Sequence, residues 1–213
     1  MVNQVLGKRT GTRLFGAPYE GACRQFRKFK VMLAEARDRK LFKAVADGDR
    51  KKTVSLLHSS IIRKGANVDA VNGWGMTLLM LTKDVEIARL LIKLGANVNA
   101  VDNWMMNALM RTQNAGIAKL IVDAGANLDL TDDRGMTALM YAINSRCVPI
   151  AELLIDKKAN LSIIDAAGKT ALMYAKDGLQ ATASAKEPGF PERAQLDSRF
   201  QRMISILESH GAK

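Results

Sequence analysis

Apolar residues recur with a helical period along most of the chain, and the pattern itself repeats. Three segments carry apolar side chains at positions i, i+3 and i+4, which predicts one buried stripe on each of three amphipathic helices; these segments are 87–92, 117–122 and 150–155. A shorter run of small and apolar residues precedes each, and a turn rich in Asn, Asp and Gly precedes that run. The pattern therefore predicts helical pairs, each opened by a turn.

The spacing of these pairs is regular. Gly-Ala-Asn begins at Gly65, Gly95 and Gly125, a step of 30 residues each time. A period of this size is typical of stacked supersecondary units and not of one globular core. We expect a basic N-terminal arm at 1–30 and a repeat domain at 31–213, consisting of a capping unit at 31–68, repeats at 69–98, 99–128 and 129–161, and an interrupted C-terminal unit at 162–213.

The two end units differ from the repeats between them. In the capping unit, the turn at 47–49 carries a helix N-cap signal, and the helix after it should be about one turn longer than its later counterparts. In the last unit, which is interrupted, we expect an insertion after Asp177-Gly178 that contains Ser184, Pro188, Gly189 and Pro191. A final helix should begin near Glu192 and end at Gly211, with a polar outer side that closes the stack.

The units resemble the ankyrin repeat, a β-turn followed by two antiparallel helices with the signature Thr-Pro-Leu-His-x-Ala. The matching positions are 77–80, 107–110, 137–142 and 170–175, which read Thr-Leu-Leu-Met, Asn-Ala-Leu-Met, Thr-Ala-Leu-Met-Tyr-Ala and Thr-Ala-Leu-Met-Tyr-Ala. The resemblance implies an all-α ankyrin-repeat solenoid of about five units. It also implies non-catalytic protein binding through the concave face of the stack, as a scaffold, adaptor or inhibitor.

The chain departs from the family pattern in three ways. Met replaces the usual His in every signature, so methionine packing should replace a polar link between repeats. The second and third units step by 30 residues against roughly 33 in the family, and the missing residues fall between the helices, so their first helices should be short. Met105 stands where a turn glycine is expected, so we expect a distorted third turn.

The resemblance also indicates where a partner would bind, because family members usually bind at the turn tips and the exposed faces of the first helices. The matching residues here are Trp74, Met76, Asn103, Trp104, Met106, Asp133, Arg134, Met136 and Lys169. Trp74 and Trp104 share one repeat position and should lie side by side. Trp and Arg dominate interface energetics, and the methionines would extend the row as an adaptable apolar strip. The alternative is that these residues pack against the neighbouring turns.

The charge balance favours acidic partners. The formal net charge is +11 and the pI is about 9.8, which suits an acidic protein, nucleic acid or anionic lipid, although such charge also simply aids solubility. The predicted arm carries much of it, at Lys8, Arg9, Arg13, Arg24, Arg27, Lys28 and Lys30. The arm could bind RNA or DNA phosphates and anchor the chain in a nucleic-acid-containing assembly. It could also be a targeting segment, which the absence of serine before Ser55 disfavours, or a solvated tail.

No residue pattern indicates catalysis. The only histidines, His58 and His210, lie in different end units, and no nucleophile, zinc or phosphate-loop motif is present. Cys23 and Cys147 form neither a disulfide framework nor a zinc cluster. The recurring Asp102, Asp132 and Asp165, with Asn72 at the matching place, read as turn residues and not as metal ligands. We expect no catalytic residue, no metal, no cofactor and no transmembrane segment, and an intracellular, cytoplasmic location, with nucleus and organelles as open alternatives.

Overall fold

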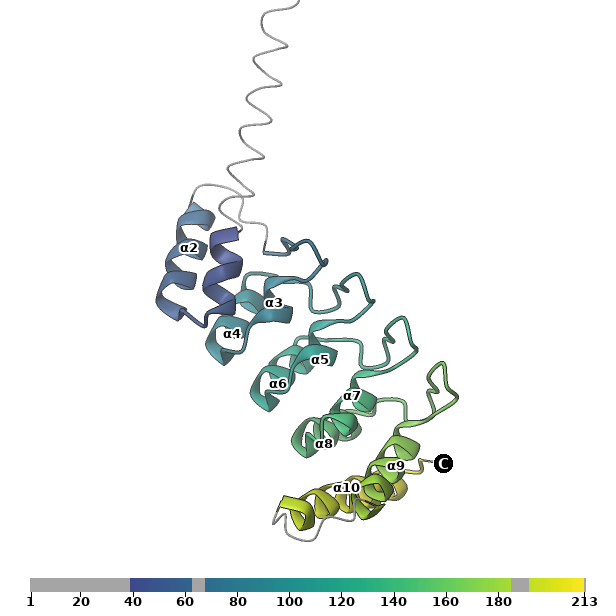
Figure 1. Ribbon diagram of the computed structural model, residues 1–213. Helices are drawn as coiled ribbons and strands as arrows, with labels where there is room; N and C mark the ends of the chain where they lie inside the picture. Colours follow the sequence, from purple (N-terminus) through teal and green to yellow (C-terminus); the bar gives the residue numbers. More distant parts are fainter. Residues whose placement is uncertain (1–38, 63–67, 185–191, 213) are drawn as a thin grey trace, which may run out of the picture. The chain divides into compact units, whose positions relative to one another are not determined.

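The computed structural model describes residues 39–62, 68–184 and 192–212. Contacts between Cα atoms join Leu41–Lys213 into one compact unit, which is described here by itself (Figure 1). Within the described residues the regular secondary structure is helical, and two isolated antiparallel bridges, Val71 with Thr77 and Thr131 with Thr137, close two of the turns. The predicted basic arm, with all of its candidate residues, lies outside the described residues.

The helices follow one another in pairs, as the apolar pattern predicts. The first pair consists of helical residues 39–46 and α2 (Arg50–Ile62). The later pairs are α3 (Leu78–Leu81) with α4 (Val85–Lys93), α5 (Ala108–Arg111) with α6 (Ala115–Asp123), α7 (Ala138–Asn144) with α8 (Val148–Asp156), and α9 (Ala171–Ser184) with α10 (Glu192–Ser209).

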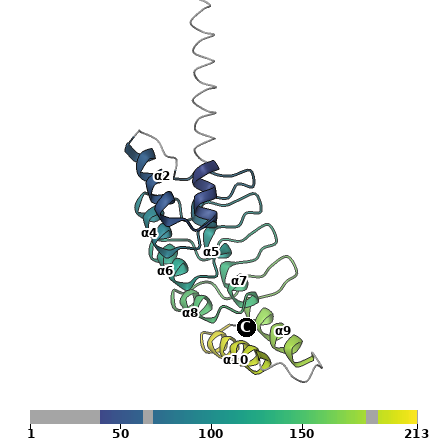
Figure 2. The same ribbon diagram turned by 60° about the vertical axis from the view of Figure 1, so that its left-hand side comes forward.

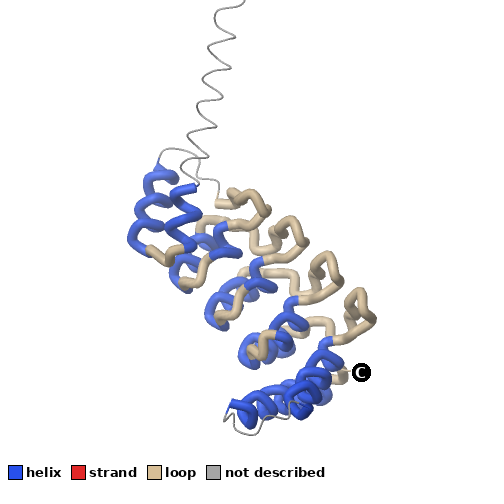
Figure 3. The backbone as a smooth tube through the Cα atoms, viewed as in Figure 1, coloured by secondary structure: helices blue, strands red, loops and turns tan. Residues whose placement is uncertain are grey.

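Equivalent helices of successive pairs lie side by side. The first helices contact one another in the order α3, α5, α7 and α9, and the second helices in the order α2, α4, α6, α8 and α10 (Figures 1 and 2). The turns that open the pairs project together on one side of this unit (Figure 3). This arrangement confirms the predicted all-α stack and places the turns in a row.

One continuous apolar core runs through the two layers. Successive pairs bury the same repeat positions, for example Leu79, Leu109, Leu139 and Leu172 from the first helices. Each unit therefore packs on its neighbours and not around a shared centre. The methionines at the usual His position are also buried, at Met80, Met110 and Met140. Methionine packing occupies the place of the polar link in these three units, as predicted, but the fourth matching residue, Met173, is 46% exposed, so the prediction is wrong there.

The lengths of the helices follow the lengths of the units. Helices α3 and α5 have 4 residues each, whereas α7, in the unit that keeps full length, has 7. The predicted shortening of the first helices is confirmed. Helix α2 has 13 residues against 9 in α4, so the capping unit carries the extra turn that the sequence predicts. The Asp49 side chain accepts a hydrogen bond from the Lys52 N–H at 3.0 Å and caps α2.

The insertion expected after Asp177-Gly178 begins as helix, because α9 continues to Ser184. A Cβ atom at Gly178 would collide with the Phe200 ring of α10. This glycine therefore serves close helix approach and not helix termination. The final helix follows the prediction, since α10 begins at Glu192 and buries Phe200, Met203 and Leu207 against the stack.

Candidate partner-binding site

Each turn folds around one side-chain oxygen. Asn72 Oδ1 accepts hydrogen bonds from the backbone N–H groups of Trp74 and Met76 at 2.9 and 3.0 Å. The same pair of bonds is made by Asp102, Asp132 and Asp165 in the later units. These bonds confirm the recurring Asp and Asn residues as turn residues.

The third turn is not distorted, contrary to the expectation from Met105. Met105 has φ of 61°, close to the 75° of Gly75 and the 76° of Gly135. Its N–H still donates to the Asp102 carbonyl at 2.9 Å, as Gly75 donates to Asn72. The hydrogen bonds of the turn hold a methionine in the left-handed conformation, which normally costs about 1–2 kcal/mol for a residue with a Cβ.

Backbone hydrogen bonds tie each turn to the next. The N–H of Asn103 donates to the Trp74 carbonyl at 3.1 Å, and the N–H of Asp133 donates to the Trp104 carbonyl at 3.2 Å. The N–H of Ala166 continues the series by donating to the Arg134 carbonyl at 2.8 Å. Trp74, Trp104 and Arg134 therefore occupy consecutive places along the row, and the predicted adjacency of the two tryptophans is confirmed.

Exposed apolar side chains gather in the second and third turns. Trp74 is 60% exposed and Trp104 is 44% exposed, and Val71, Val101 and Met105 are exposed beside them in sequence. We call these five residues the tip surface. The sequence interpretation found the two tryptophans but missed Val71, Val101 and Met105. Apolar groups gathered in this way commonly mark an interaction site.

The methionines predicted to extend this row do not do so. Met136 is only 5% exposed, and Met76 and Met106 are half-buried and pack against the core. Each one directly precedes the N-cap of a first helix, so its side chain enters the stack where the chain turns inward. The alternative interpretation, packing within the repeats, is the correct one for Met76, Met106 and Met136.

Some of the remaining predicted residues are accessible, and others already form interactions within the chain. Asn103 and Asp133 are exposed at the turn tips, and their N–H groups link neighbouring turns. The Arg134 side chain is exposed and donates hydrogen bonds to Asp132 and to the Tyr141 hydroxyl. Lys169 is half-buried and forms an ion pair with Asp177 at 2.7 Å, so it is less available than the others.

Sequence reasoning missed the side chains that complete the turns, nine residues after each turn aspartate. Arg111 Nε donates to Asp102 Oδ2 at 2.6 Å, and the Tyr141 hydroxyl donates to Asp132 Oδ2 at 2.7 Å. The Tyr174 hydroxyl donates to Asp165 Oδ2 at 2.5 Å in the last unit. In the second unit the turn residue is the neutral Asn72, and the matching position is Leu81, which has no donor. The constant spacing of nine residues could have revealed these pairs in the sequence, because both members of the pair change together in the second unit.

These bonds shift the acid–base behaviour of the turn residues. The hydrogen bond from Tyr174 is the main cause that lowers the pKa of Asp165, and it raises the pKa of Tyr174 to about 12. Burial alone would raise the pKa of Asp132, but hydrogen bonds from Tyr141 and from two backbone N–H groups outweigh burial and lower it. Asp132 and Asp165 are therefore constant negative charges near neutral pH.

Two family models match the chain over adjoining stretches. Residues 74–103 match the ankyrin repeat, and residues 105–183 match ankyrin repeats in three copies. The chain belongs to the ankyrin-repeat family. A comparison with curated proteins gave no significant match. Ankyrin repeats generally mediate protein–protein interaction and are typically non-catalytic, so family membership implies a protein partner.

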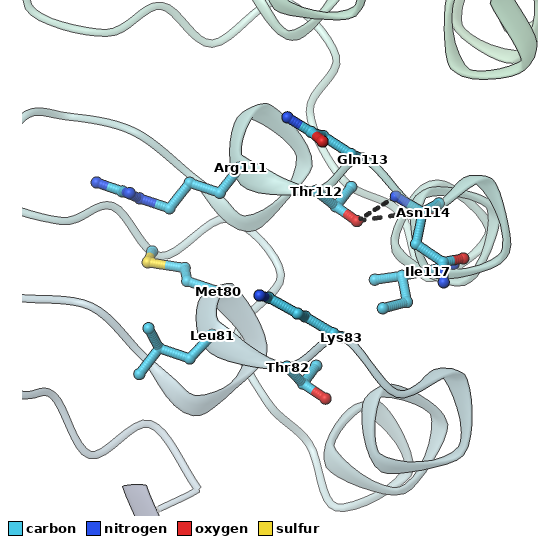
Figure 4. A pocket seen from close by; sticks show the side chains of 9 residues that line it. All are labelled: Met80, Leu81, Thr82, Lys83, Arg111, Thr112, Gln113, Asn114 and Ile117. Atoms are coloured by element: carbon cyan, nitrogen blue, oxygen red, sulfur yellow. Dashed lines mark hydrogen bonds between the residues drawn. The ribbon is translucent and has the colours of Figure 1, made fainter. Parts of the chain in front are cut away.

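A hollow lies in the second and third units, whose first helices are short. It measures about 560 Å³ and lies between the loops that follow α3 and α5, with Lys83 and Arg111 extending from its lining away from Ile117 (Figure 4). The Arg111 guanidinium also lies 5.6 Å from the centre of the Trp104 ring. A basic hollow therefore adjoins the tip surface of this ankyrin stack.

The histidines do not meet in this stack. His58 belongs to α2, and His210 follows α10, where its Nδ1 lies 2.8 Å from the Ile206 carbonyl oxygen. Among the described residues, no group of three or more His, Cys, Asp or Glu side chains is placed to hold a metal ion. In the same part of the chain, no helix combines the length and apolar character that crossing a membrane requires.

Proposed function

We propose that this ankyrin stack binds a protein partner through the tip surface and the adjoining first helices, on the side that is concave in the family. The chain would act as a scaffold, adaptor or inhibitor. The observation that carries this proposal is the pair of exposed tryptophans on adjacent turns. Tryptophan is among the residues most enriched at binding hot spots, where a few buried side chains supply most of the affinity.

The energetics of the tip surface support a partner. Covering the exposed parts of Trp74 and Trp104 would contribute about 5 kcal/mol before the entropic costs of association. Met105 supplies a second argument, because it holds a strained conformation while its side chain remains 51% exposed. Packing of the Met105 side chain within the chain does not offset the free-energy cost of its left-handed backbone conformation. A contact between Met105 and a partner would offset this cost.

Charge indicates the chemistry of the partner. Arg111 stacks beside Trp104, Arg134 follows it along the row of turns, and Lys83 lines the adjoining hollow. These cations favour a partner segment in which apolar side chains are flanked by acidic residues. The formal net charge of +11 supports the same choice, because it attracts acidic proteins at long range.

The decisive experiment removes both indole rings. A partner captured by the wild-type chain and identified by mass spectrometry would be titrated against Trp74→Ala/Trp104→Ala, with circular dichroism as the check of folding. We expect affinity to fall by about 100-fold or more. The control is Val54→Ala, which removes a 36% exposed apolar side chain on α2, a second helix outside the proposed site. A folded double variant with full affinity would refute the proposal.

The same rings provide a direct signal, because Trp74 and Trp104 are the only tryptophans in the chain. Their fluorescence should shift to shorter wavelength when the partner covers them. Deletion of residues 1–30 separates this proposal from the nucleic-acid alternative. Binding by the stack should survive the deletion and tolerate salt, whereas binding by the arm would be lost and would weaken steeply with salt.

A further inference from the structure

Three arginines surround a second hollow, far along the chain from the tip surface. It measures about 610 Å³ and forms where the loop between α7 and α8 meets α10. The loop contributes Arg146, and α10 contributes Arg199 and Arg202. Apolar atoms of Val148 and Pro149, at the start of α8, line the remainder. The hollow thus combines concentrated positive charge with an apolar wall.

One of the three arginines has an acidic partner among the side chains that the structure describes. Arg202 forms an ion pair with Glu152 at 2.5 Å. The Arg146 guanidinium lies 5.8 Å from the centre of the Phe200 ring, and Arg199 is exposed on α10. Among the described side chains, those of residues 39–57, 68–181 and 197–212, no carboxylate pairs with Arg146 or Arg199. Within this part of the chain, the positive charges of Arg146 and Arg199 are therefore available to a ligand.

The start of α8 adds to this positive field. Helices α4 and α6 begin with Asp84 and Asn114, whose side-chain oxygens accept backbone hydrogen bonds at the helix start. Cys147 takes the matching position before α8 and makes no such hydrogen bond. The positive end of the α8 dipole is therefore left without the side-chain oxygen that caps its counterparts.

The surrounding charges limit what this cluster can bind. Three lysines of the fourth and fifth units form ion pairs, namely Lys157 with Asp123, Lys169 with Asp177 and Lys176 with Glu208. A nucleic acid strand requires an extended track of free cations, because its affinity depends on the number of phosphates neutralised. This cluster is compact, which favours a ligand with one or two anionic groups close together.

We propose that this hollow binds an acidic peptide segment of a partner protein. Carboxylates of the segment pair with Arg146 and Arg199, and an apolar side chain between them packs against Val148 and Pro149. A guanidinium fork matches a carboxylate in shape, and the Arg202–Glu152 pair already shows this chemistry at the site. The site is independent of the tip surface and stands whether or not the proposed function is correct.

The test uses the full chain and a fluorescein-labelled peptide Glu-Glu-Leu-Glu-Glu, followed by fluorescence anisotropy. Arg199→Glu should weaken binding by about tenfold or more. Lys119→Glu makes the same change of charge at an exposed lysine on α6 and should alter binding by less than about twofold. Arg199→Lys, which keeps the charge and removes the fork, should fall between wild type and Arg199→Glu.

Three results would overturn the proposal. The first is no measurable binding of the peptide to the wild-type chain. The second is equal weakening by Arg199→Glu and Lys119→Glu, which would indicate general attraction to net charge. The third is loss of peptide binding in Trp74→Ala/Trp104→Ala, which would place the peptide on the tip surface instead. A mixed-sequence RNA oligonucleotide that binds in an Arg199-dependent manner and displaces the peptide would likewise replace the peptide with nucleic acid as the ligand.

Discussion

At the scale of single residues, Asn107 is the clearest departure from the repeat pattern. It is buried and caps α5 by accepting a hydrogen bond from the Met110 N–H, but its Nδ2 group has no hydrogen-bond partner among the described residues. The matching residues Thr77, Thr137 and Thr170 make the same cap through a hydroxyl. A buried polar group without a partner costs about 1–3 kcal/mol, so Asn107 should lower the stability of the third unit.

We therefore expect Asn107→Thr to raise the free energy of unfolding by about 1 kcal/mol, because threonine keeps the cap and removes the unpaired amide. Urea unfolding followed by circular dichroism measures this change. Thr137→Asn introduces the same amide in the fourth unit and should shift the midpoint of urea unfolding to a lower urea concentration. A less stable Asn107→Thr protein would show that the amide has an important partner.

At the scale of the turn and its helix, paired side chains make stability depend on pH. The pKa values of Asp132 and Asp165 are lowered in the folded chain. Such carboxyl groups contribute stability that is complete above the unfolded pKa of about 4 and is lost as the pH falls through the folded pKa. The pKa of Tyr174 is raised to about 12, so this residue affects stability at high pH. Its contribution to stability is lost as the pH rises from about 10 toward 12.

The double variant Asp132→Asn/Tyr141→Leu copies the Asn72 and Leu81 pair of the second unit. We expect its stability to fall less steeply than that of the wild type as the pH is lowered below about 4, because the amide does not titrate. Urea unfolding at a series of pH values measures the slope. Asp156→Asn changes an exposed aspartate on α8 and should leave the slope unchanged. An unchanged slope in the double variant would contradict the role given to the turn carboxylates.

At the scale of the whole molecule, the sequence predicts well the order of the units and which residues are neighbours. It predicts poorly the direction in which a side chain points. Equal spacing places Trp74 beside Trp104, because equivalent residues of stacked units must be neighbours. The direction of Met136 depends on where the turn closes around Asp132, which the spacing does not reveal. The sequence does not explain Gly178, because glycine marks both helix ends and close helix contacts, and only the position of Phe200 distinguishes the two.

The stack also determines how far a local defect spreads. Gly178→Ala would press a methyl group against the Phe200 ring, and such overpacking costs about 1–3 kcal/mol, partly offset by about 1 kcal/mol of helix propensity. Because α9 and α10 contact the stack on one side through α7 and α8, the loosening should stay at this end of the described unit. Leu109→Ala, in the middle, should cost about 2–5 kcal/mol and weaken the units on both sides.

Hydrogen exchange measured helix by helix distinguishes these two patterns. Gly178→Ala should lower amide protection in α9 and α10 and leave α4 and α6 unchanged, whereas Leu109→Ala should lower protection in all of them. Gly73→Ala is the control for a glycine-to-alanine change, because the new methyl would meet no atom within 4 Å. Uniform loss of protection in Gly178→Ala would mean that the unit unfolds as one cooperative body and that the nearest-neighbour description is wrong.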